Sequence, residues 1–120
     1  MGSRLFSPIS LADVELRNRI IVSPMCQYSA DAGCATDWHL MHLGQFAVSG
    51  VGLILTEAVG VEMAGRITPG CLSLCSDAQE SSLKRVVDFC QKFGHAKMAI
   101  QLAHAGRKGS TDLSKRIKQG

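Results

Sequence analysis

Three short apolar segments, each followed by a polar or glycine-rich stretch, stand out in the hydrophobic pattern of the chain. They lie at residues 20–23, 53–59 and 97–104, and the last two read LILTEAV and KMAIQLAH. Pro24 cannot continue a strand ladder and closes the first segment. The second is apolar through its first half, which is typical of a strand buried on both faces. The pattern predicts three β-strands.

Two segments between these strands carry apolar residues at helical spacing. The first predicted helix spans residues 38–49, with Thr36 or Asp37 as its N-terminal cap and glycines after its end. The second begins at the sequence SDAQ, residues 76–79, which has the pattern of a capping box. Its apolar positions fall on one face until Gly94, which we expect to supply the C-terminal cap.

The predicted order is strand, helix, strand, helix, strand, so the sheet should be parallel with right-handed crossovers. Two α/β architectures fit this order. A doubly wound sheet needs about five strands, and a (β/α)8 barrel needs eight strands and roughly 250 residues. We therefore expect the front part of a larger fold. Residues 62–77 exceed the usual two to six residues of a βα connection and predict a functional loop.

Composition narrows the class of protein. With 46% hydrophobic and 19% charged residues and a net charge of +3, the chain has the profile of a globular protein without a nucleic-acid or membrane partner. Its five cysteines form no CxxC pair. We find no signal peptide and no apolar run approaching the roughly 18 residues of a membrane helix. These features predict a reducing, cytoplasmic setting.

The ends of the predicted strands carry the candidate chemistry. In both parallel architectures ligands bind outside the carboxyl ends of the strands. The three ends read SPMCQY (residues 23–28), TEA (56–58) and QLAH (101–104). A thiol, a phenol, a carboxamide and backbone amides form a neutral hydrogen-bonding set, which suits a planar heterocycle better than a phosphate or a metal. Cys26, Cys34, His39 and His42 match no familiar zinc spacing, so we predict no metal site.

Several separated motifs then occur in a recognisable order: RNRIIVSPMCQYS, DWHLMHL, TEAVGV, GRITPG, SD and QLAHAGRK. Together they resemble the Old Yellow Enzyme family, and in particular its thermophilic-like, bacterial-type branch. The resemblance implies that residues 1–108 are the N-terminal part of an FMN-binding (β/α)8 TIM barrel, with about three parallel strands and two to three helices. Residues 109–120 form a basic tail without a counterpart, in which Leu113 and Ile117 have the spacing of a short helix.

Membership would imply an oxidoreductase that takes hydride from NADPH onto FMN and passes it to an activated alkene, such as an α,β-unsaturated carbonyl compound. The hydride chemistry belongs to the flavin, while the protein binds the cofactor and polarises the acceptor. By resemblance, Ser23, Pro24 and Met25 face the cofactor. Cys26 tunes the flavin potential from the reactive edge of the ring, and Tyr28 reaches the substrate carbonyl.

Two further cofactor contacts follow from the resemblance. Ala58 offers its backbone amide to the flavin, and Gln101 hydrogen-bonds the pyrimidine edge of the ring. His104, Arg107 and Lys108 receive no chemical step.

The family's substrate-binding His pair, its tyrosine proton donor and most phosphate contacts come from later strands. We therefore expect this chain alone to be inactive, and the full-length form could assemble as a homo-oligomer. Two alternatives stay open. The chain could be a non-catalytic fragment or partner-binding module, or it could be a compact doubly wound binding domain.

Overall fold

The computed structural model describes residues 2–112. A three-stranded parallel sheet, in the order β3-β4-β5, forms its centre. The strands are β3 (Ile21–Val22), β4 (Leu53–Gly60) and β5 (Lys97–Ala103), and the helices between them are α1 (Asp37–Ala47) and α2 (Asp77–Phe93). The predicted order of strands and helices is confirmed. The elements end within about two residues of their predicted limits, and both helices are slightly shorter than expected.

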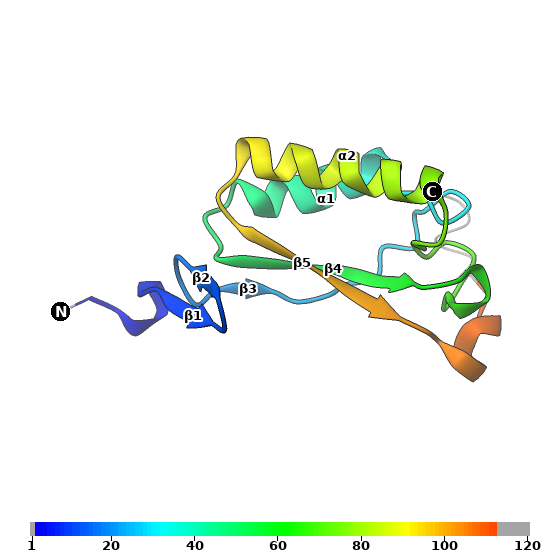
Figure 1. Cartoon of the computed structure of the whole chain (residues 1–120), viewed down its shortest axis with the longest axis horizontal. Helices are drawn as coiled ribbons and strands as arrows, with labels where there is room; N and C mark the ends of the chain where they lie inside the picture. The colour runs from blue at the N-terminus through cyan, green and yellow to red at the C-terminus, as the bar shows by residue number, and fades with distance from the viewer. Residues whose placement is uncertain (1, 113–120) are drawn as a thin grey trace.

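Both helices cover the same face of the sheet, as Figure 1 shows. Val22, Ile54 and Met98 are direct neighbours across the three strands and pack on this side. They meet Leu43 of α1 and Val86 of α2, both buried. No helix of residues 2–112 covers the opposite face. The core therefore lies on one side of the sheet only.

The observed caps of α2 agree in part with the caps predicted from the sequence. Ser76 is the N-terminal cap and accepts a hydrogen bond from the Gln79 backbone at 3.3 Å. The Gln79 side chain does not return to Ser76, because its Oε1 accepts from the Cys75 N–H at 2.9 Å. Gly94 is the C-terminal cap, but its φ of −122° is not left-handed. Glycine is needed there because a Cβ would lie 2.2 Å from the Ala47 carbonyl oxygen.

A hairpin that the sequence pattern did not reveal precedes the sheet. It consists of β1 (Ile9–Leu11) and β2 (Val14–Leu16), paired antiparallel. The hairpin lies near the amino ends of the sheet strands. Asn18 then anchors the chain, because its side chain donates to the Gly50 carbonyl at 2.7 Å and accepts from the Ile20 N–H at 3.1 Å.

The expected functional loop, residues 62–77, folds back over the carboxyl end of β4 and ends where α2 begins. The segment begins with the 3-10 helix η2 (Met63–Gly65). Leu72 then accepts from the Gly60 N–H at 2.9 Å, and Gly70 accepts from the Ala30 N–H at 2.9 Å. The loop therefore ties the exit of β4 to the segment that follows β3.

Two shorter helices complete the described chain. They are the 3-10 helices η1 (Arg4–Phe6) and η3 (Gly106–Ser110). The predicted helix around Leu113 and Ile117 lies outside the described residues. Neither α-helix within residues 2–112 is long and apolar enough to cross a bilayer.

Candidate functional site at the carboxyl ends of the strands

Ala58 of β4 and Gln101 of β5 are direct partners in the parallel ladder. Met98 packs against the helices, and side chains alternate along a strand. Gln101, three residues later, therefore faces the helix-free side of the sheet. Its carboxamide is exposed and makes no hydrogen bond within residues 2–112. Two of the predicted cofactor contacts thus lie side by side, with the amide group of Gln101 available to a ligand.

The segment after β3 brings the first motif to the same edge. Ser23 and Met25 are exposed, whereas Pro24 is half-buried. Gln27 holds this segment, since its Nε2 donates to the Met25 carbonyl at 2.9 Å and its Oε1 accepts from the Trp38 indole at 2.9 Å. Cys26, the next residue of this motif after Met25, lies close to Ala58 of β4.

Cys26 connects the two strand ends. Its half-buried thiol lies close to the Ala58 backbone N–H and to the thiol of Cys71, and both affect its pKa. Burial raises the pKa of Cys26, the Ala58 N–H opposes this rise, and Cys71 and Glu57 add to it. Cys26 is therefore a neutral thiol at neutral pH, able to donate a hydrogen bond but a poor nucleophile.

Tyr28 lies close to this group in an uncommon backbone conformation. Its φ is +53°, a left-handed value that bulky residues rarely adopt. Burial raises the pKa of its phenol, and Cys26, Cys71 and Glu57 raise it further. Within the described chain the hydroxyl makes no hydrogen bond. Tyr28 thus carries a protonated donor, set in place by a backbone geometry that costs free energy.

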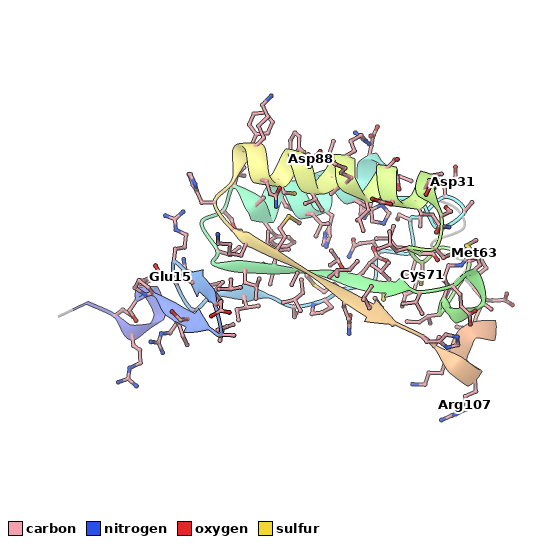
Figure 2. All side chains as sticks on the ribbon, in the orientation of Figure 1. Glu15, Asp31, Met63, Cys71, Asp88 and Arg107 are labelled. Atoms are coloured by element: carbon pink, nitrogen blue, oxygen red, sulfur yellow. The ribbon has the colours of Figure 1, made fainter. Side chains whose placement is uncertain are left out.

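His104, at the end of β5, makes its contacts away from this group, with Glu62 and Gly106. Its Nε2 lies 2.6 Å from Oε1 of Glu62, and its Nδ1 accepts from the Gly106 N–H at 3.0 Å. Arg107 and Lys108 are exposed on η3, and Figure 2 shows Arg107 beyond the end of the sheet. The structure gives none of the three a contact with Cys26, Ala58 or Gln101.

Sequence reasoning missed three residues near this edge. Cys71 was interpreted as an ordinary buried cysteine, and Figure 2 shows it at the carboxyl end of β4, the end opposite Glu15. Glu57 and His39 are both buried, with His39 Nε2 3.1 Å from Glu57 Oε1. A charged residue inside the apolar run of β4 was the available signal, because buried carboxylates require a partner.

The described residues contain no group of three or more His, Cys, Asp or Glu side chains placed to hold a metal ion. What the strand ends do present is the thiol of Cys26, the phenol of Tyr28 and the amide of Gln101. These neutral groups fit the polar edges of a planar ring.

Comparison with known proteins identifies the family. Residues 4–120 match the family model of the NADH:flavin oxidoreductase / NADH oxidase family. The chain belongs to this family. The matched range includes residues 109–120, for which the motifs gave no counterpart. Flavin oxidoreductases of this kind use FMN, and the neutral groups of Cys26, Tyr28 and Gln101 suit its ring.

Individual relatives and solved structures support this family assignment. An NADPH dehydrogenase from Listeria monocytogenes is 50% identical over 108 residues, which are 88% of this chain and 32% of that protein. A NADH:flavin oxidoreductase from Gibberella zeae is 46% identical over 109 residues, 91% of this chain and 26% of the relative. Morphinone reductase superposes with a TM-score of 0.77 at 30% identity, over 83% of this chain and 26% of that one. The chain thus spans about a third or less of each.

These matches decide between the two parallel architectures. Old Yellow Enzyme structures, among them a homologue from Zymomonas mobilis, share the fold of this chain. The predicted α/β class, an N-terminal portion of a (β/α)8 barrel, is confirmed. The roles assigned to Ser23, Pro24, Met25, Cys26, Tyr28, Ala58 and Gln101 stay predictions.

Proposed function

We propose that this chain forms the cofactor-facing first part of an FMN-dependent NAD(P)H oxidoreductase. The whole protein would pass hydride from NADPH to an activated alkene, such as an α,β-unsaturated carbonyl compound. The family match and the relative that is named an NADPH dehydrogenase support this activity. The alkene is inferred from the resemblance to Old Yellow Enzymes.

The observation that carries the proposal is the grouping of Cys26, Ala58 and Gln101 at one edge of the sheet. Ala58 and Gln101 are ladder partners, and the Cys26 thiol lies close enough to the Ala58 N–H for that group to affect its pKa. Residues from the carboxyl ends of β4 and β5 and from the segment after β3 thus lie together at one edge of the sheet. A flat ring can lie on such a surface and find hydrogen-bonding partners at its edges.

Each side chain has a distinct task in this proposal. Gln101 would orient the ring through its carboxamide, and Ser23, Pro24 and Met25 would border it. Cys26 would offer a neutral thiol near the reactive edge of the ring. Bound FMN would supply the hydride chemistry. Tyr28 would donate its phenolic proton in a hydrogen bond to the substrate carbonyl, where negative charge develops.

We place the protein in the cytoplasm, with a small enone-type molecule as its substrate and no nucleic-acid or membrane partner. All five cysteines, which lie within the described residues, are free thiols. Free thiols are typical of a reducing compartment. Homo-oligomers of the full-length form remain compatible with the proposal.

The test uses the complete barrel protein that contains these residues. FMN titration followed by flavin fluorescence should show one cofactor per barrel. The Cys26→Ala variant should shift the flavin potential to more negative values by about 30 mV, which for two electrons corresponds to the roughly 1.4 kcal/mol of one hydrogen bond.

Cys90→Ala is the matched control, since Cys90 is also a buried thiol but packs between α2 and the sheet. This variant should leave the potential unchanged. A barrel that fails to bind FMN would contradict the proposal as a whole and would favour a non-catalytic role. An equal potential in Cys26→Ala and the native protein would remove only the role given to Cys26.

A further inference from the structure

The strand β4 contains a β-bulge immediately before Ala58. Leu55 pairs with Ala99, and the next pair joins Ala58 to Gln101. Three residue steps on β4 thus match two steps on β5, so Thr56 and Glu57 together face one residue of the partner strand. A bulge of this kind re-aims the side chains that follow it.

The effect of the bulge on the two faces can be followed along β4. Before it, Ile54 packs against the helices. After it, Glu57 and Val59 are buried on the helix side, where Glu57 meets His39 and Val59 packs with Leu83. Odd-numbered positions have therefore replaced even-numbered ones on that face. Since one extra residue inverts the alternation, Ala58 turns to the helix-free side.

The hydroxyl of Thr56 closes the gap that the bulge leaves in the ladder. Thr56 is 3% exposed. Its Oγ1 accepts a hydrogen bond from the Gln101 backbone N–H at 3.3 Å and donates one to the Glu57 carbonyl at 3.0 Å. One side chain thus satisfies a backbone donor of β5 and a backbone acceptor of β4 at the irregular point.

Glu57 anchors the bulge from the other side. Oε1 of its carboxylate lies 3.1 Å from Nε2 of His39, and both side chains are almost completely buried. Nδ1 of His39 accepts from the Thr36 N–H at 2.9 Å, which leaves the proton of a neutral ring on Nε2, the nitrogen nearest the carboxylate. The first turn of α1 thereby holds the bulge against the helix layer.

We propose that Thr56 is a positioning residue of the flavin site, because its hydroxyl holds the bulge that places Ala58 and Gln101 in register on one face of the sheet. This inference rests on the proposed function. It adds a residue that would touch neither flavin nor substrate. Thr56 acts through the backbone of Gln101 and of Glu57, the residue that precedes Ala58.

Two variants of the complete barrel separate a positioning role from simple packing. Thr56→Val keeps the shape and the β-branch but removes the hydroxyl, whereas Thr56→Ser keeps the hydroxyl and loses a methyl group. Hydrogen exchange is measured at the backbone N–H of Gln101. The Lys97 amide, which donates to the Gly52 carbonyl at 3.0 Å at the other end of β5, is the internal reference. FMN affinity is measured in parallel by fluorescence titration.

Thr56→Val should speed exchange at Gln101 about tenfold, leave Lys97 unchanged and weaken FMN binding by roughly tenfold, the effect of losing one hydrogen bond. Thr56→Ser should keep both values near those of the native protein. If Thr56→Val does not fold, Thr56→Ala replaces it and the same contrast with Thr56→Ser applies.

Equal exchange at Gln101 and equal FMN affinity in the valine and serine variants would overturn the positioning role while leaving the flavin assignment intact. A native barrel that binds no FMN would instead refute the proposed function, and the positioning role would fail with it. Measuring FMN binding by the native barrel therefore distinguishes the two failures.

Discussion

His39 and Glu57 meet in the core, with Nε2 of the histidine 3.1 Å from Oε1 of the glutamate. The contact is not an aligned hydrogen bond, since neither Nε2 of His39 nor Oε2 of Glu57 has a hydrogen-bond partner among residues 2–112. Removing His39 would leave the buried Glu57 side chain without its partner, and an uncompensated carboxylate in the core is strongly destabilising. The stability of the chain should therefore depend strongly on His39.

We expect His39→Ala to lower the free energy of unfolding by about 3 kcal/mol or more, since the Glu57 carboxylate would lose its partner. Glu57→Gln keeps an oxygen facing His39 and should cost only about 1 kcal/mol. Urea unfolding followed by circular dichroism measures both. Equal losses in the two variants would show that packing, and not the charge of Glu57, dominates at this position.

Gly94→Ala should destabilise the contact between the ends of the two helices. The added Cβ would lie 2.2 Å from the Ala47 carbonyl oxygen, which belongs to the backbone and cannot move aside freely. Overpacking of this kind costs about 1–3 kcal/mol. Gly2→Ala is the control, since its Cβ meets nothing within 4 Å. Thermal unfolding should show a lower midpoint for Gly94→Ala and an unchanged midpoint for Gly2→Ala.

Stability should fall in alkaline solution. Burial is the largest cause that raises the pKa of Cys26 and Cys90 above 9.0 and that of Tyr28 above 10.0. The native state therefore keeps protons that the unfolded chain releases as the pH passes these ordinary values. The stabilisation is complete below about pH 9 and is lost as the pH rises through the raised pKa values.

Urea midpoints measured between pH 7.5 and 10.5 test this dependence. Cys90→Ala should flatten the curve, because one of the three groups is removed. A midpoint that stays constant over this range in the native chain would contradict the expected titration of buried thiols.

Tyr28→Phe tests the substrate contact in the complete barrel. The ring is retained, so the left-handed backbone at this position changes little. We expect the rate of enone reduction to fall about tenfold, because one prepositioned donor to the carbonyl is lost while others from later strands remain. Flavin reduction by NADPH should be unaffected. Rapid-mixing kinetics separates the two half-reactions, and an equal slowing of both would contradict a contact with the enone.

Local signals in the sequence were sufficient to predict the elements that build the sheet and its helix layer. The Ser76 cap defines the start of α2, and the apolar run from Leu53 identifies β4. The grouping of strand ends followed from topology alone, because parallel strands carry their carboxyl ends to the same edge. These predictions required no knowledge of contacts between distant residues.

Other features depend on long-range packing and have no local signature. The hairpin turn at Ala12 has a φ of +50° without the Gly or Asn that usually marks such a turn. The bulge at Thr56 depends on α1, which supplies His39 to Glu57. The contact between Cys26 and Cys71 depends on the path of the loop after β4. Tertiary packing decides each of these positions.

The one-sided core divides the sheet into two surfaces with different mutational tolerance. Val22, Ile54 and Met98 form a continuous apolar row beneath the helices, whereas Gln101 projects from the other side. Substitutions at outward positions such as Gln101 should therefore affect ligand binding more than folding, whereas substitutions in the inward row should affect folding. Within β5, neighbouring residues would then be selected for different properties, the inward ones for packing and the outward ones for ligand contact.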